Sequence, residues 1–350
     1  MGIEITIETN ASLRSGVALA SKYSSDGIVN LMFGKGTLTM LGYTNTTFCI
    51  CKEYIDCNTI YSLRIQSGAL QSILGCPQVR FSIETKAVLI SGLDKSGNLV
   101  RRARIKYNTD GNINYVAESY QDIIGRLRSG YSCKSLESMK RFDKISRIND
   151  KAERGVVISN NQFYTGGNGF KYYSTTEMKF NCFILGDDLK KLIDFVGGDE
   201  CILYQQDGLV VAKNKNECYF GVRVSDPLED AVSVRAITKM APVCSFMAPI
   251  AELKSSLRPL RTTSKVSDGK IIFYPQRNIV SVVMPDVAFE LAIGFTDFSG
   301  EVIGDITLNY KLFNRLLQTI DVSARTTISV YPNFISMLST DESLLLISRE

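Results

Sequence analysis

The chain has 350 residues, and its hydrophobic fraction of 45% is that of a globular protein long enough for two or three domains. Its 40 basic and 36 acidic residues leave a net charge of +4, which is too small by itself to indicate a nucleic-acid partner. No apolar run approaches the length of a membrane span, and the N-terminal MGIEITIETN lacks the basic region and apolar core of a signal peptide, so we expect a cytoplasmic protein with no membrane partner.

The residue inventory also limits the chemistry. The chain contains no histidine, which removes Ser-His-Asp and Cys-His catalysis as well as histidine acid–base chemistry. Its nine cysteines lie mostly in apolar strand patterns, and Cys49-x-Cys51 followed by Cys57 fits no common zinc site. The glycine-rich run 166–169 lies between two strand patterns, where a hairpin turn explains it better than a phosphate-binding loop. We therefore expect a protein that is not an enzyme and uses no cofactor or metal.

One supersecondary pattern recurs six times along the chain. Each copy reads as a short apolar strand, one amphipathic helix of about three turns, and two or three strands rich in β-branched and aromatic residues. The clearest copies are residues 180–224 and 304–348. A repeat of roughly 50 residues predicts the architecture before any single motif is considered.

The first two copies show the pattern at the N-terminal end. A strand is predicted over residues 3–8, followed by a helix that Thr9 or Asn10 caps. In the second copy a strand over residues 59–65 leads into a short helix, for which Ser67 is the expected N-cap.

The other four copies carry equally clear helix signals. The third predicts a helix over residues 135–148, and the fourth predicts one over residues 187–196, with acidic residues in its first turn. Pro249 marks the start of the fifth helix and Asn309 caps the sixth.

Taken in pairs, the six copies predict three similar domains, each with two helices. Residues 116–127 predict either a connector helix or an edge segment at the first junction. The fold class is α+β, with the helices on one face of antiparallel sheets. The predicted domains are residues 1–112, 129–235 and 240–350.

Basic residues recur on the predicted helices, away from the apolar stripe of each. On any single helix such a row is most simply a solvated face. Its recurrence in five of the six copies favours a surface that contacts phosphates without reading base sequence. The candidate DNA-binding residues are Arg14, Lys22, Lys140, Lys144, Arg147, Lys190, Lys191, Lys254, Arg258, Arg261, Lys311 and Arg315.

This arrangement resembles that of the DNA sliding clamps, and most closely the bacterial three-domain clamp, the beta subunit of the replicative DNA polymerase. The segment FILGDDLKKLIDFVGGDECILYQQDGLVVAKNKNECYFGVRVSDP is similar to the second half of that family's middle domain, and the last 45 residues are similar to its closing half-domain. The resemblance implies a homodimeric ring whose helices line a hole around double-stranded DNA. It also implies a processivity factor with DNA polymerase and a clamp loader as partners.

The resemblance further implies a pocket for short partner peptides between the middle and last domains. Gly169-Phe170-Lys171-Tyr172 stands at the place of the family's Gly-His-Arg-Leu turn, and Pro242 matches a pocket proline. At the C-terminal end, Leu345, Leu346 and Ile347 replace the family's Met-Pro-Met-type segment, so partner specificity is expected to differ. Divergence of this kind suits a phage or viral clamp, which would act in the host cytoplasm.

Three alternatives remain open at this point. One is a monomeric clamp-like processivity factor that holds DNA by charge alone. Another is a β-rich viral structural protein that assembles without nucleic acid. The third is an enzyme with a carboxylate site, although the lack of histidine and of any catalytic motif argues against it.

Overall fold

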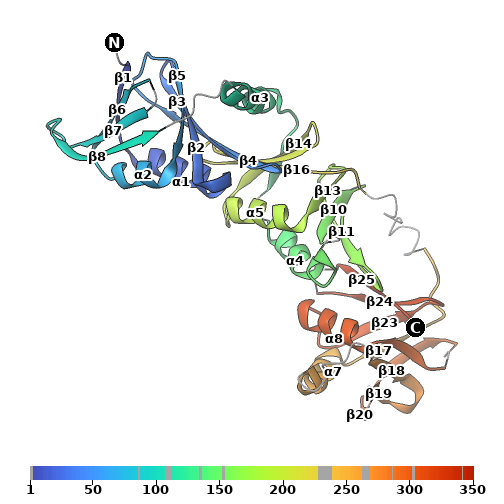
Figure 1. The fold of residues 1–350 in the computed structure, drawn as a ribbon. Helices are drawn as coiled ribbons and strands as arrows, with labels where there is room; N and C mark the ends of the chain where they lie inside the picture. The colour runs from blue at the N-terminus through green and yellow to red at the C-terminus, as the bar shows by residue number, and fades with distance from the viewer. Residues whose placement is uncertain are drawn as a thin grey trace. The chain divides into compact units, whose positions relative to one another are not determined.

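The computed structural model describes residues 3–85, 87–106, 112–133, 136–151, 154–227, 239–261, 269–285, 287–301, 304–340 and 342–350. These residues form two compact units (Figure 1). Unit 1 comprises Met1–Leu136 and Lys191–Val224, and unit 2 comprises Glu137–Lys190 and Ser225–Glu350. Each unit contains two antiparallel sheets, and every sheet lies within one unit.

Unit 1 contains a four-stranded sheet in the order β1-β6-β7-β8 and an eight-stranded sheet in the order β5-β2-β3-β4-β16-β15-β14-β9. The strands are β1 (Ile3–Glu8), β2 (Ile28–Gly34), β3 (Thr37–Tyr43), β4 (Thr47–Tyr54), β5 (Tyr61–Gln66), β6 (Gln78–Ile83), β7 (Ala87–Leu93), β8 (Leu99–Lys106), β9 (Tyr131–Cys133), β14 (Cys201–Gln206), β15 (Leu209–Asn214) and β16 (Tyr219–Arg223). The helical segments are α1 (Ala11–Lys22), η1 (Ser25–Gly27), α2 (Ser67–Ile73) and α3 (Asn112–Arg126), and α5 (Gly186–Val196) crosses the division between the units.

Helix α1 is held against the eight-stranded sheet by a close backbone approach. The Asn10 side chain accepts a hydrogen bond from the Leu13 backbone N–H at 2.7 Å, which confirms the predicted N-cap. A Cβ atom added to Gly42 of β3 would lie 1.7 Å from the Ala20 carbonyl oxygen of α1. Only glycine fits at this contact, so the sequence of β3 sets how near the helix can lie.

Helix α2 begins at Ser67, one residue earlier than a helix with Ser67 as its N-cap would begin. Ser67 is the first helical residue and Gln66 precedes it without a side-chain cap, so the prediction of Ser67 as N-cap is wrong. The Ser67 hydroxyl instead hydrogen-bonds the Ser21 hydroxyl of α1 at 2.6 Å. The serine therefore links α2 to α1.

Helix α3 covers the other face of the eight-stranded sheet (Figure 1). Met40 and Gly42 of β3 face α1, whereas Leu41 between them packs with Phe48 beneath α3, since side chains alternate along a strand. The Tyr120 ring of α3 stacks on Phe48 with ring centroids 4.3 Å apart. Residues 116–127, for which the sequence predicts either a connector helix or an edge segment, thus lie, except for the last, in a helix that packs on the sheet. This helix is additional to the six predicted from the repeat.

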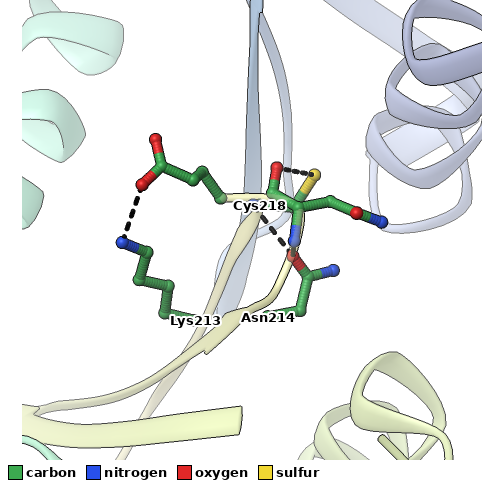
Figure 2. A network of polar contacts seen from close by, with 5 residues as sticks. Lys213, Asn214 and Cys218 are labelled. Atoms are coloured by element: carbon green, nitrogen blue, oxygen red, sulfur yellow. Dashed lines mark hydrogen bonds and ion pairs between the residues drawn. The ribbon is translucent and has the colours of Figure 1, made fainter. Parts of the chain in front are cut away.

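The turn between β15 and β16 is fixed by one asparagine (Figure 2). Asn214 Oδ1 accepts hydrogen bonds from the backbone N–H groups of Asn216 and Cys218, both at 3.0 Å. Lys213 Nζ donates to Glu217 Oε1 at 3.0 Å across the same turn. This turn directs β16 alongside β4, where the two strands pair over residues 47–50 and 219–222.

Unit 2 contains a nine-stranded sheet in the order β13-β10-β11-β12-β25-β24-β23-β17-β21 and a four-stranded sheet in the order β20-β19-β18-β22. The strands are β10 (Gly155–Ser159), β11 (Gln162–Gly167), β12 (Phe170–Thr175), β13 (Cys182–Leu185), β17 (Cys244–Ala248), β18 (Lys270–Tyr274), β19 (Ile279–Val283), β20 (Ala288–Ala292), β21 (Thr296–Gly300), β22 (Ile306–Asn309), β23 (Thr326–Val330), β24 (Phe334–Leu338) and β25 (Leu344–Ser348). The helical segments are α4 (Glu137–Ser146), α7 (Ile250–Leu257), η3 (Pro259–Arg261), η4 (Pro275–Arg277) and α8 (Tyr310–Thr319).

Strand pairing joins segments that the repeat assigned to different domains. Strand β4 pairs with β16, and β12 pairs with β25, so two sheets run without interruption across the predicted junctions. The expected hairpin at residues 166–169 forms between β11 and β12, and Gly169 has a φ of 90° at its turn. The division into three domains at 1–112, 129–235 and 240–350 stays a proposal. Continuous sheets are compatible with it only if neighbouring domains share a sheet at each junction.

Candidate nucleic-acid interface

Helix α4 separates its apolar and basic residues by side. Met139, Phe142 and Ile145 are buried against the nine-stranded sheet, which the Phe142–Phe163 ring contact at 5.6 Å illustrates. The basic residues Lys144 and Arg147 are exposed on the outer side. This is the arrangement that the helical spacing of the sequence predicts.

Lys140 of α4 and Arg147, which directly follows the helix, are partly neutralised by carboxylates of α4. Lys140 Nζ lies 2.5 Å from Glu137 Oε1, and Arg147 Nη2 lies 2.7 Å from Asp143 Oδ2. The Asp143 side chain is 12% exposed, so its contact with Arg147 is better shielded from water than a surface pair. Lys144 has no carboxylate partner within the described part of the chain.

Helix α8 has an apolar side, a basic side and a polar row between them. Asn309 caps the helix by accepting from the Leu312 N–H at 3.0 Å, as predicted. Lys311 and Arg315 are exposed, and α8 carries no acidic residue. The polar row consists of Tyr310, Asn314 and Gln318.

A groove lies between α4 and α8, with a volume of about 430 Å³. Basic side chains of both helices form its rim, and the polar row of α8 contributes to its floor. The lining residues are Lys144, Arg147, Ile148, Tyr310, Lys311, Asn314, Arg315, Gln318 and Thr319. Arg315 Nη2 donates to the Arg147 carbonyl oxygen at 3.3 Å, which ties the two helices together beside the groove.

A second hollow, of about 390 Å³, continues from this groove toward α7. The two share Lys144, Gln318 and Thr319. The lining residues of the second are Glu137, Lys140, Arg141, Lys144, Lys254, Gln318, Thr319, Ile320 and Asp321. Together the two hollows gather cations from three helices of unit 2, and such a cleft concentrates positive potential more than isolated surface charges do.

Three contributors to this surface are not among the residues predicted from the sequence. Arg141 lines the second hollow but falls outside the predicted row of Lys140, Lys144 and Arg147. Asn314 and Gln318 are uncharged, so the recurrence of basic residues does not indicate them. The spacing of Tyr310, Asn314 and Gln318 at every fourth position was the signal that marks one continuous row.

Three other candidate cations in unit 2 or on α5, whose side chains the structure describes, do not line these two hollows. Lys190 is exposed on α5 and Arg258 is exposed at the end of α7, while Lys191 is half-buried. Arg261 ends η3, and its side chain lies outside the described part of the chain.

In unit 1 the candidate cations are Arg14 and Lys22, both exposed on α1, and the half-buried Lys191 of α5. Lys22 Nζ stands 5.0 Å from the centroid of the Tyr23 ring. Helix α2 carries no charged residue.

Most residues assigned to the peptide pocket lie inside unit 2. Phe170, Tyr172, Leu345 and Ile347 are at most 3% exposed. The Tyr172 ring lies 5.1 Å from the Phe142 ring of α4, so this side of β12 faces the helices. Phe170 lies on the same side as Tyr172, because side chains alternate along a strand. Ile347 and Leu345 pair with Phe170 and Tyr172, so they face this side as well.

The other pocket candidates lie elsewhere. Lys171 and Leu346 pair with each other across the seam and face away from α4. Pro242 is exposed, and Gly169 forms the turn before β12.

The face of this seam that points away from α4 carries an apolar cluster, here called the seam cluster. Tyr173 and Leu346 are its buried centre, and the half-buried side chains around them are Tyr164, Phe334 and Leu344. The Tyr173 hydroxyl has no hydrogen-bond partner among the described residues. Burial, followed by the nearby Tyr164, raises the pKa of the Tyr173 phenol to about 12, so the group is neutral and available as a donor at physiological pH.

Other kinds of site are not evident in the described residues. No group of three or more cysteine, aspartate or glutamate side chains there could hold a metal ion. None of the helices described is long and apolar enough to cross a membrane.

Comparison with known proteins identifies the fold. No family profile and no curated protein sequence matches the chain. Among solved structures, the DNA polymerase III subunit beta from Pseudomonas aeruginosa is 10% identical with a TM-score of 0.73, and the match covers 99% of this chain and 100% of that one. A putative DNA polymerase III beta subunit from Eubacterium rectale is 15% identical with a TM-score of 0.71, and both chains are covered fully. The beta subunit from Thermotoga maritima is 12% identical with a TM-score of 0.66, and 99% of each chain is covered.

At such low identities the likeness shows the fold. It confirms the predicted resemblance to the bacterial sliding clamps and the α+β clamp fold class. The chain therefore has the clamp fold over its whole length, with a sequence far diverged from those of the matching structures.

Proposed function

We propose that this chain is a sliding clamp, which encircles duplex DNA as a homodimeric ring and tethers a DNA polymerase and other replication proteins. The observation that carries the proposal is the gathering of cations from α4, α7 and α8 around two connected hollows in a chain with the clamp fold. A ring holds DNA topologically, so phosphate contacts need only be weak and independent of base sequence. Such a role needs no catalytic residue, cofactor or metal.

For the ring to close, we propose that edge strand β8 of one copy pairs with edge strand β20 of the next. Both are outermost strands of their sheets, and an unpaired edge presents free backbone donors and acceptors. Strand β8 carries four basic residues and exposes Leu99 and Val100. On the other edge, β20 carries Glu290, and Val287 just before the strand is 46% exposed. A head-to-tail contact of this kind closes into a ring when the rotation between copies permits.

We also propose the seam cluster, rather than the core residues beside it, as the docking site for partner peptides. Of the residues that the resemblance predicts for the pocket, Leu346 and Lys171 face this side. The cluster offers aromatic and aliphatic side chains, together with the Tyr173 hydroxyl, which has no hydrogen-bond partner among the residues described. Peptide hot spots of one or two large apolar anchors bind to sites of this composition.

The test of the ring is retention on DNA of different topology. The protein is assembled on a nicked circular duplex and on the same duplex after linearisation, and retention is measured by gel filtration at increasing salt. We expect retention on the circle at salt concentrations that remove the protein from the linear form. Equal loss from both would indicate a monomeric factor that holds DNA by charge alone, because such binding depends on salt and not on topology. No binding to either would favour a β-rich assembly protein.

A further inference from the structure

The cations of this protein are arranged differently in the two units. In unit 2, Lys144 of α4 and Lys311 of α8 line one groove from opposite helices, and neither has a carboxylate partner among the residues described. In unit 1, Arg14 and Lys22 lie on a single helix, about two turns apart. Lys191 of α5 also belongs to unit 1, where it is half-buried and its carbonyl oxygen accepts from the Tyr23 hydroxyl at 3.4 Å. The repeat thus presents two exposed lysines across a groove in unit 2, whereas the two exposed candidate cations of unit 1 share one helix.

The floor of the groove suits a phosphate oxygen. Asn314 Nδ2 donates to the Tyr310 hydroxyl at 3.2 Å, so the phenol oxygen accepts this bond while its own O–H remains available as a donor. Gln318 Nε2 donates to Asn314 Oδ1 at 3.4 Å and extends the row. Tyr310 is 2% exposed and Asn314 is 5% exposed, yet both line the groove. A buried polar floor beneath opposed cations is a built site for an anion and not merely a solvated helix face.

We propose that the α4–α8 groove is the principal binding site for a backbone phosphate of duplex DNA, so that the ring contacts DNA mainly through unit 2. This inference rests on the proposed clamp function and adds which part of the surface holds the polyanion. Opposed cations over a low-dielectric floor focus the potential, whereas the row on α1 is bathed by solvent. Lys144 and Lys311 are the central pair, because Arg147 and Arg315 are already engaged by Asp143 and by the Arg147 carbonyl.

The test compares matched pairs of substitutions in the complete protein. Equilibrium binding of a short fluorescent duplex is measured against KCl concentration for the wild type, K144Q/K311Q, R14Q/K22Q and the conservative K144R/K311R. Each phosphate contact contributes about 0.9 to the slope of log affinity against log salt, so K144Q/K311Q should lower the slope by about 2 and weaken binding roughly 10- to 100-fold at about 0.1 M salt. The R14Q/K22Q pair should lose less than half as much, and K144R/K311R should retain the wild-type slope.

Two results would overturn the inference. One is a loss in R14Q/K22Q equal to or greater than that in K144Q/K311Q, and the other is an unchanged slope in K144Q/K311Q. All four side chains substituted are at the surface, so unfolding temperatures should stay close to the wild-type value and confirm that folding is intact. If the protein is retained on circular DNA while either overturning result appears, only the groove assignment fails. If wild-type protein neither binds the short duplex nor is retained on circular DNA, the clamp function fails with it.

Discussion

One repeated sequence pattern produces the helices of both units, but their contacts differ. The two contacts compared are that of α1 with β3 in unit 1 and that of α4 with α8 in unit 2. Between α1 and β3 there is no space for even one methyl group at Gly42. Between α4 and α8 there is a groove of about 430 Å³ with a polar floor and a basic rim. The difference shows that the repeat determines where a helix lies. The residues at each contact then determine whether the helix packs tightly or leaves a groove beside it.

The largest effect is expected where the backbone approach is closest. Substituting Gly42→Ala brings a methyl group against the Ala20 carbonyl oxygen, and backbone cannot rotate away as a side chain can. We expect the free energy of unfolding to fall by about 3 kcal/mol or more. Chemical denaturation of the variant measures this change.

Gly68→Ala is the matched control in the same unit. A Cβ atom at Gly68 meets nothing within 4 Å, and the residue lies in α2. We expect a change between zero and a gain of about 1 kcal/mol, because alanine favours a helix over glycine. If both variants lose similar stability, the close approach at Gly42 is not what holds α1.

The second effect concerns the seam cluster in unit 2. Substituting Leu346→Ala truncates one of the two buried residues at the centre of the cluster, and we expect partner-peptide affinity to fall on the order of 10-fold or more, as for a hot-spot residue. The matched control is Leu338→Ala, since Leu338 lies two strands from β12 in the same sheet and is 56% exposed. Peptide binding measured by calorimetry checks both. Equal losses in the two variants would remove the cluster from the proposed docking site.

Sequence analysis predicted the helices well because each leaves a strong local signal. Asn10 and Asn309 cap their helices as the sequence indicates, and the apolar stripe of α4 is buried as its spacing requires. Strand pairing across the chain, such as β12 with β25, has no local signal, because it joins residues 171 positions or more apart. For the same reason the sequence did not distinguish which residues of β12 face the core.

That ambiguity explains the outcome for the peptide pocket. The resemblance identifies the Gly-Phe-Lys-Tyr turn, but side chains alternate along the strand, so Tyr172 faces α4 and Tyr173 lies on the opposite face of the sheet. The groove was only partly predictable for a related reason. Lys144 and Lys311 were selected from their helices, whereas their convergence depends on the packing of α4 beside α8.

The third prediction compares the N-terminal caps of α1 in unit 1 and α8 in unit 2. Asn10 and Asn309 accept backbone N–H groups at 2.7 Å and 3.0 Å, so the caps are equivalent. Replacing each with alanine should lower the free energy of unfolding by about 1 kcal/mol in both units. Thermal unfolding of N10A and N309A measures the two losses. A difference of more than about 1 kcal/mol between the variants would mean that tertiary contacts, and not the caps, dominate at one of them.

The smallest effect concerns charge pairs on α4. Substituting Glu137→Gln frees Lys140 from its partner, but the pair is exposed at its carboxylate end, where the side chain is 68% exposed. We expect a change in the free energy of unfolding below about 1 kcal/mol. The salt slope of DNA binding should rise slightly, because a freed lysine adds one phosphate contact. A fall in that slope would contradict the placement of Lys140 on the DNA-facing surface.

The central claim, that the protein encircles DNA, is tested most directly with linear duplexes that differ only at their ends. The protein is assembled on one duplex whose two ends are blocked by tightly bound bulky proteins and on an identical duplex with open ends, and the dissociation rate is followed at moderate salt. A ring that slides should remain on the blocked duplex and leave the open one rapidly, because its escape route is the end and not the release of phosphate contacts. Equal dissociation rates from the two duplexes would contradict the proposed function.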